Sequence, residues 1–154
     1  MRLLLMFLLL SGALSLSAQK VAIDDEVATV DGTPYCRIQK TNCKLGACDL
    51  RIATLDGTEI IFIKLTSYND PATRSAASPE GRVVFYDWTF LSTGAKAETD
   101  FINQKNAVKA MVDARLLKDG AIDETGERNF MAINGKRHSQ RQEQLGLPVI
   151  IIQR

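Results

Sequence analysis

The sequence predicts an α+β domain: an antiparallel β-meander of about five strands, two helices after it, and a C-terminal strand that returns to the sheet. Two apolar runs, residues 59–68 and 82–91, are rich in the β-branched and aromatic residues that favour strands. Turn signals separate the shorter runs that precede them. After Gly94 the apolar spacing changes from the period of a strand to that of a helix.

Residues 1–19 have the layout of a secretory signal peptide. Arg2 gives an early positive charge, an apolar run follows, and small residues lead to Ala18 and Gln19. The apolar run is shorter than the about 20 residues that a membrane-spanning helix needs, although a retained anchor is the alternative. We expect cleavage after Ala18 or Gln19, one domain over residues 20–154, no membrane span after signal removal, and a periplasmic or secreted location.

The charge balance gives no reason to expect nucleic acid as a partner. The sequence has 19 basic and 18 acidic residues, and loss of Arg2 with the signal leaves the remainder formally neutral. A neutral domain has no overall attraction to nucleic acid or to an anionic membrane surface. The local clusters at residues 24–26 and 136–141 are typical of solvated segments.

The first strands are predicted from the turns between them. Residues 27–30 and 35–41 flank Asp31-Gly32, a dipeptide typical of tight hairpin turns. Residues 48–55 form the next predicted strand, and a second Asp-Gly pair leads from it into the first apolar run. Because tight turns are sufficient connections only between antiparallel neighbours, the order is a meander.

Three cysteines, Cys36, Cys43 and Cys48, lie close together in a chain that we expect to reach an oxidising compartment. If the strands on either side of the turn pair, Cys36 lies too far along its strand to bond Cys48. Cys43 and Cys48 flank the turn. We therefore predict a Cys43–Cys48 disulfide and a free thiol at Cys36.

One observation opposes this disulfide. Ile38 pairs most sensibly with Leu50 or Ile52 on the apolar side of the hairpin. That register places Asn42, and not its cysteine neighbour, opposite Cys48.

The cysteines predict neither a metal site nor a catalytic thiol. Their spacing, Cys-x6-Cys-x4-Cys, matches none of the paired spacings of zinc sites, and the only histidine in the sequence, His138, is distant. A catalytic thiol also needs an activating base. His138 stands among charged and polar residues after a predicted helix end, so we expect an exposed surface histidine. We expect no metal and no cofactor.

Asp87 is the acidic residue with the strongest case for chemistry. It stands between Tyr86 and Trp88 in a largely apolar strand, where burial would raise the pKa of the carboxyl group and suit it to acid–base work. The alternative is an outward position at the edge of the sheet, or pairing with Lys64 on the neighbouring strand.

Residues 69–81 lack periodicity and are too long for a hairpin turn. Two interpretations are open: a contact surface held by two rigid strands, or a mobile connection with no partner. The candidate binding residues of this loop are Asn69, Asp70, Arg74 and Glu80.

Two helices are predicted after the sheet. Apolar residues recur at helical spacing over residues 100–117, with Asp100 or Asn103 as the cap and Asp119-Gly120 as the end. Residues 124–134 follow Asp123 as N-cap and precede Gly135.

In this second helix Phe130 and Ile133 would face the sheet, and Gly126 would cost about 1 kcal/mol relative to alanine. The last predicted element is a strand at residues 147–154, where four consecutive β-branched residues follow Pro148.

Four stretches carry a resemblance: the signal ending Ser-Ala-Gln, residues 60–71, the Ser-Pro-Glu-Gly of residues 78–81, and the Leu-Leu-Lys-Asp-Gly of residues 116–120. In these stretches the chain resembles small uncharacterised exported bacterial proteins, and the likeness as a whole covers residues 31–135. The resemblance implies an exported domain and transfers no activity, ligand or site residue.

Sequence motifs do not select an activity. No Gly-rich phosphate loop, Gly-x-Ser-x-Gly elbow or His-Glu-x-x-His occurs. The leading hypothesis is an exported, non-enzymatic module that binds a protein or envelope component. The alternatives are a small hydrolase-type enzyme using Asp87 or His138 near the 69–81 loop, and a structural role in the envelope.

Overall fold

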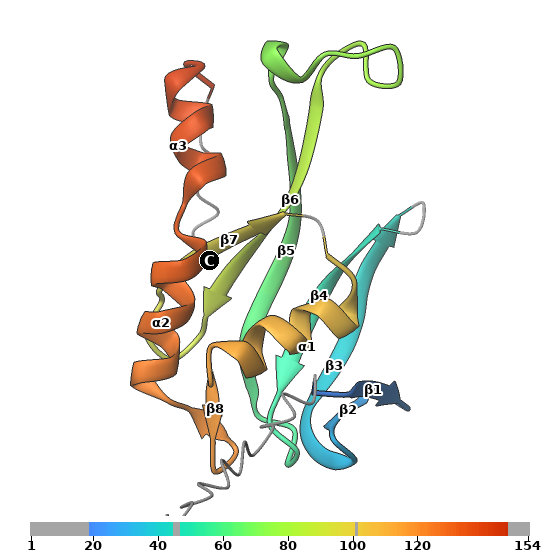
Figure 1. Ribbon diagram of the computed structural model, residues 1–154, viewed down its shortest axis with the longest axis vertical. Helices are drawn as coiled ribbons and strands as arrows, with labels where there is room; N and C mark the ends of the chain where they lie inside the picture. Colours follow the sequence, from blue (N-terminus) through green and yellow to red (C-terminus); the bar gives the residue numbers. More distant parts are fainter. Residues whose placement is uncertain (1–18, 45–46, 101, 148–154) are drawn as a thin grey trace, which may run out of the picture.

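The computed structural model describes residues 19–44, 47–100 and 102–147 (Figure 1). Within these residues, seven antiparallel strands follow one another across a single sheet in sequence order. The strands are β1 (Val21–Asp24), β2 (Val27–Val30), β3 (Thr33–Lys44), β4 (Ala47–Ala53), β5 (Glu59–Asn69), β6 (Arg82–Phe90) and β7 (Lys96–Asp100). The predicted meander is confirmed. Nearly all of the predicted signal peptide and of the predicted final strand lies outside the described residues.

The sheet has two more strands in sequence order than predicted, β1 and β7. The turn after β1 uses Asp25 and Glu26, whose φ angles of 43° and 63° form a tight hairpin without the glycine that usually marks one. β7 (Lys-Ala-Glu-Thr-Asp) is mostly polar, so its sequence lacks the apolar alternation of a strand.

The part of the chain after β7 holds the helices α1 (Gln104–Asp113), α2 (Glu124–Asn134) and α3 (Arg137–Gln144), and the short hairpin of β8 (Leu117–Lys118) and β9 (Ala121–Ile122). α1 is shorter than predicted. It begins after Asn103, whose side chain accepts a hydrogen bond from the Asn106 amide at 2.9 Å. Asp119-Gly120, the predicted helix end, instead forms the β8–β9 turn. α2 has its predicted bounds and caps, whereas α3 is not among the predicted elements.

The hydrophobic core lies between one face of the sheet and the helices α1 and α2 (Figure 1). Trp88 and Phe130 pack with ring centroids 4.7 Å apart, and both are fully buried. The Trp88 indole N–H donates to the Thr99 hydroxyl at 3.0 Å. The prediction that Phe130 faces the sheet is confirmed, but that for Ile133 is wrong, because Ile133 is 72% exposed.

At Gly126, α2 lies close against the backbone of the preceding chain. A Cβ atom at this position would lie 2.2 Å from the Arg115 carbonyl oxygen and 2.8 Å from the Leu116 Cα. Both neighbours are backbone atoms, which no side-chain rotation can move. Glycine is therefore required here by packing, although it weakens the helix by itself.

The Cys43–Cys48 disulfide is confirmed, and Cys36 is a free, buried thiol. The predicted register is also correct, because Ile38 pairs with Ile52. The register then shifts between Thr41 and Lys44. Asn42 has a φ of 50° in this bulge, and the extra residue brings Cys43 opposite Cys48.

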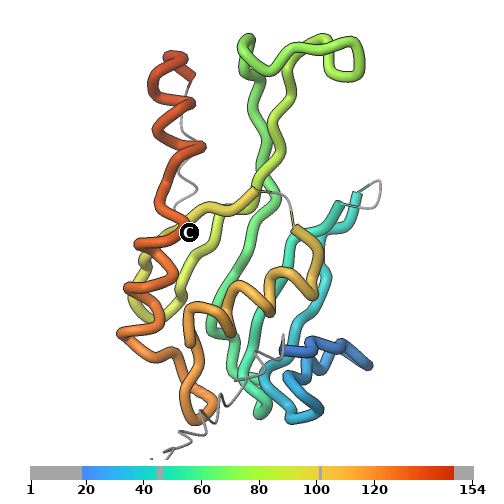
Figure 2. The backbone as a smooth tube through the Cα atoms, in the orientation of Figure 1, coloured from blue at the N-terminus to red at the C-terminus, as the bar shows by residue number. Residues whose placement is uncertain are grey.

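β5 and β6 extend beyond the neighbouring strands as a long hairpin, and α3 runs beside this extension (Figure 2). Between the two strands, local hydrogen bonds join several residues of the segment 70–81. Pro71–Thr73 form a 3-10 helix, and Ser75 and Ser78 exchange two backbone hydrogen bonds of 3.1 Å.

Candidate functional site

The strands of the sheet present two different faces. In β6, Tyr86, Trp88 and Phe90 point to the core and are buried. The alternate residues Asp87 and Thr89 point to the opposite face, which we call the open face. α1 and α2 pack on the core side, so the open face carries the alternate side chains of the strands, both polar and apolar, and α3.

A groove of about 900 Å³ lies on the open face. Its floor is formed by β5, β6 and β7, one wall by α3, and the opposite wall by the β3–β4 hairpin. Six of the lining residues carry most of its chemical character: Phe62, Lys64, Asp87, Lys96, Ser139 and Gln142. A concave site with a few convergent polar groups is where small ligands and chain segments usually bind.

Asp87 lies in the middle of the groove floor. In the register of the sheet it stands opposite Lys64 of β5 and Glu98 of β7. Its Oδ2 atom lies 3.4 Å from the Lys96 Nζ atom. Burial raises the pKa of Asp87, although the ammonium groups of Lys96 and Lys64 oppose the shift. Partial burial and pairing with Lys64 are alternatives for Asp87 from the sequence; the structure shows partial burial and a register position opposite Lys64, and the ion pair is made with Lys96.

Two other carboxylates of the groove are already engaged in holding the fold. Asp49 accepts hydrogen bonds from the Leu65 amide and the Asn42 side chain, each at 2.8 Å. Glu98 is 3% exposed and accepts from the backbone amides of His138 and Ser139, at 2.7 and 3.1 Å. These groups shape the groove and have little capacity left for a ligand.

The remaining floor combines an aromatic ring with polar groups. Phe62 contributes a half-buried ring, and the Arg51 guanidinium lies 6.0 Å from its centroid. Within the described part of the chain, the Lys64 ammonium and the hydroxyl groups of Thr66 and Thr89 make no hydrogen bond. The groove can therefore offer donors, acceptors and an apolar surface together.

His138 is buried, and the prediction of an exposed histidine is wrong. It is 7% exposed, and its ring stacks on Phe85 with centroids 4.4 Å apart. Its Nε2 atom lies 3.1 Å from an Asp100 carboxylate oxygen, and its Nδ1 atom 3.5 Å from the Tyr68 hydroxyl. The reason for the error is that the sequence does not predict α3, so nothing in it indicates that this polar segment packs on the sheet.

The four predicted loop residues lie outside the groove. Asn69, Arg74 and Glu80 are exposed at the end of the β5–β6 hairpin. Asp70 is 5% exposed, accepts from the Ala72 amide at 2.9 Å as the cap of the 3-10 helix, and pairs with an arginine of α3.

Within the described residues, no group of three or more His, Cys, Asp or Glu side chains is placed to hold a metal ion. The helices of the described ranges include none that is long and apolar enough to cross a membrane. No protein-family model, curated protein or solved structure matches the chain.

Proposed function

We propose that this protein is an exported, non-enzymatic binding module and that its ligand, a protein or envelope component, occupies the groove on the open face. The observation that carries the proposal is the asymmetry of the sheet. One face is buried under α1 and α2, while the other carries a groove of about 900 Å³ over β5, β6 and β7.

The chemistry of the groove supports binding. Lys64 provides a cationic donor, Asp87 an acceptor, and Phe62 an apolar surface. Charged groups of both signs lie side by side, so the groove attracts neither anions nor cations as a class. It fits a ligand that combines an apolar surface with hydrogen-bonding groups of both kinds.

The disulfide supports export. A Cys43–Cys48 bond forms and persists in oxidising compartments such as the periplasm or the cell exterior. The signal-like sequence of residues 1–19 predicts the same location.

The test is capture of an envelope component by the immobilised mature chain, residues 20–154. Thr89→Arg places a long charged side chain on the groove floor without replacing a core residue. Thr125→Arg makes the same replacement at an exposed position on α2 and is the matched control. We expect capture by the wild type and by the control, and loss of capture with Thr89→Arg. Equal capture by all three proteins would exclude the groove.

The 69–81 loop is a second candidate contact surface, with Asn69, Asp70, Arg74 and Glu80 as its candidate residues. Replacing residues 72–78 with a Gly-Ser turn separates the two sites. The groove proposal requires that this shortened protein still captures the ligand. Loss of capture on shortening, with normal capture by Thr89→Arg, would assign binding to the loop.

A small hydrolase-type enzyme is the second candidate function, and one observation favours it. A partly buried carboxyl group with a raised pKa, such as Asp87, is suited to act as a general acid. His138 offers less, because it is buried and both ring nitrogens have partners. Turnover of the captured ligand by the wild type, and its loss with Asp87→Asn, would establish the enzyme. Capture without turnover supports the binding module.

A further inference from the structure

The helix α3 is attached to the rest of the fold in an unusual way. Its sequence, Arg-His-Ser-Gln-Arg-Gln-Glu-Gln, contains no aliphatic residue and no Phe, Tyr or Trp. Most helices of globular proteins are held by burial of an apolar face, which is the larger part of their stability. α3 has no such face, so its position depends on individual polar contacts.

Four contacts hold α3 against the sheet, and one of them is an ion pair of 2.5 Å between Arg137 Nη2 and Asp100 Oδ2 of β7. At its first turn, buried Glu98 of β7 accepts from the amides of His138 and Ser139 and from the Ser139 hydroxyl. Beside it, the His138 ring stacks on Phe85 of β6 and contacts Asp100.

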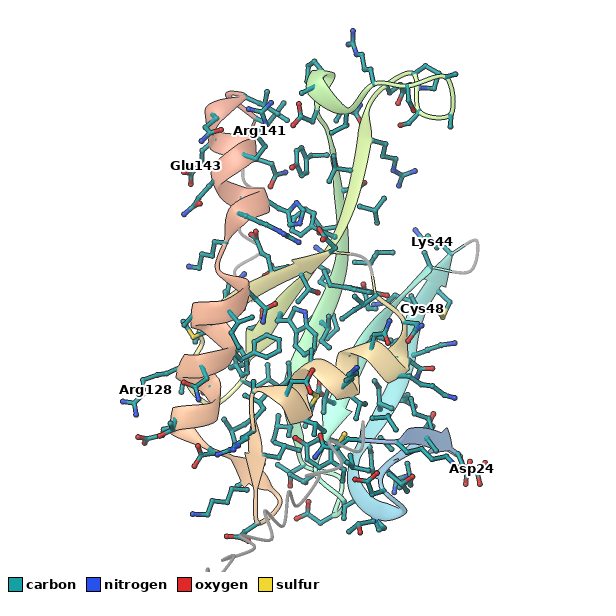
Figure 3. All side chains as sticks on the ribbon, viewed as in Figure 1. Asp24, Lys44, Cys48, Arg128, Arg141 and Glu143 are labelled. Atoms are coloured by element: carbon teal, nitrogen blue, oxygen red, sulfur yellow. A yellow bond between two sulfur atoms is a disulfide. The ribbon has the colours of Figure 1, made fainter. Side chains whose placement is uncertain are left out.

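The fourth contact is made further along the helix. The Arg141 guanidinium binds the Asp70 carboxylate through two hydrogen bonds, Nε to Oδ2 at 2.7 Å and Nη2 to Oδ1 at 2.9 Å. Figure 3 shows Arg141 on the side of α3 that faces the β5–β6 hairpin. A two-bond arginine–carboxylate pair fixes direction as well as distance.

The same helix forms one wall of the groove. Ser139 and Gln142 line the groove from α3. Gln142 is 8% exposed, and its carbonyl oxygen accepts from the Leu147 amide at 3.0 Å, which closes the end of the helix. If α3 moved away from the hairpin, these two side chains would leave the groove.

We propose that α3 is a movable wall of the groove, which detaches from the sheet as a unit while α2 and the sheet stay folded. Segments with few buried apolar contacts open at lower free energy than the core. A ligand that touches Ser139 or Gln142 binds the docked state and so favours it. This role as a wall rests on the proposed function, but the detachment itself does not.

The sequence provides a single-site probe of detachment, because His138 is its only histidine. Diethyl pyrocarbonate acylates accessible imidazole nitrogens, and mass spectrometry of the peptide that contains His138 follows the reaction. In the docked state the ring is covered by Phe85 and Tyr68. We expect acylation far slower than that of N-acetylhistidine, at a rate set by the opening of α3.

The variant Arg141→Gln removes the pair with Asp70 and should accelerate acylation about tenfold, since hydrogen bonds to charged groups are worth roughly this factor. Arg128→Gln is the matched control, because Arg128 lies at an exposed position of α2 and bonds only Thr125 within the described residues. Amide hydrogen exchange of residues 124–134, measured in parallel, reports whether the whole domain has opened.

The expected result is faster acylation in Arg141→Gln alone, with exchange of α2 unchanged in all three proteins. Three results would overturn the proposal: acylation of the wild type as fast as N-acetylhistidine, equal acceleration of α2 exchange and His138 acylation, or no effect of Arg141→Gln. None of these measurements uses a ligand, so their results are independent of the result of the capture experiment.

Discussion

Replacing Gly126 with alanine should destabilise the protein, although helix propensity alone predicts the opposite. Alanine is favoured over glycine inside a helix by about 1 kcal/mol. At this position, however, the new Cβ atom would meet the Arg115 carbonyl oxygen at 2.2 Å and the Leu116 Cα at 2.8 Å. Carbon atoms in contact lie about 3.5 to 4.0 Å apart, so α2 must move by about 1 Å.

The cost of this movement depends on the contacts of α2. Overpacking of a tight interior contact costs about 1 to 3 kcal/mol. Moving the first turn also strains the cap in which the Gly126 amide donates to Asp123 at 2.8 Å, a bond type worth about 1 kcal/mol. After the gain in propensity, the expected net loss is about 2 kcal/mol.

Urea unfolding followed by the fluorescence of Trp88, the only tryptophan, measures the change. Ala132→Gly, at an exposed position of the same helix, is the control and should cost about 1 kcal/mol through propensity alone. A Gly126→Ala protein more stable than the wild type by about 1 kcal/mol would refute the packing argument.

Four further predictions concern titration and redox state. The hydrogen-bonded Arg141 guanidinium holds the pKa of Asp70 below its ordinary value. The stabilisation that ionised Asp70 gives the fold is therefore present above its pKa in the unfolded chain and is lost as the pH falls through its pKa in the folded protein. An acid titration of the unfolding free energy of Asp70→Asn should lack this loss. Burial raises the pKa of Asp87, so ionisation of Asp87 destabilises the fold as the pH rises. The unfolding free energy of the wild type should therefore decrease between acidic and neutral pH, and that of Asp87→Asn should decrease less. The Cys43–Cys48 bond closes no long loop, and its reduction should cost less than about 2 kcal/mol by urea unfolding. Cys36, whose pKa burial raises to about 12, should resist thiol reagents until the protein unfolds.

The sequence is most informative where apolar residues dominate. The runs that form β5 and β6 are β-branched and aromatic, so their strand character is predictable without the fold. α2 is predictable because both of its ends carry capping residues, Asp123 and Gly135. From the sequence alone, Gly126 indicates only a weak point in that helix, because the sequence does not show that the backbone of Arg115 lies close to it.

Two of the elements that the sequence does not predict, β7 and α3, are polar segments whose positions depend on tertiary contacts. β7 has only a few residues, and the burial of Glu98 depends on α3 packing above it. α3 itself is polar throughout, so no periodicity marks the face that it turns to the sheet. For the same reason the sequence predicts an exposed His138, although its ring is covered by Phe85.

Only some of the residues that line the groove are predictable from the sequence. Asp87 stands out from its apolar neighbours, and its pairing with Lys64 follows from the register of two adjacent strands. Ser139 and Gln142 are not predictable, because their place in the groove depends on α3. A second sequence signal for the groove is that the outward residues of β5 and β6, such as Phe62, are neither all apolar nor all polar.

The most direct test of the central claim is to locate the ligand on the surface. A photo-reactive benzoylphenylalanine at Leu91, which is 43% exposed at the groove, reports contact there, and the same residue at Ala76 reports contact at the hairpin loop. After irradiation with envelope extract, a covalent adduct at position 91 and none at position 76 is the predicted result. An adduct at position 76 alone would contradict the claim that the open face binds the ligand.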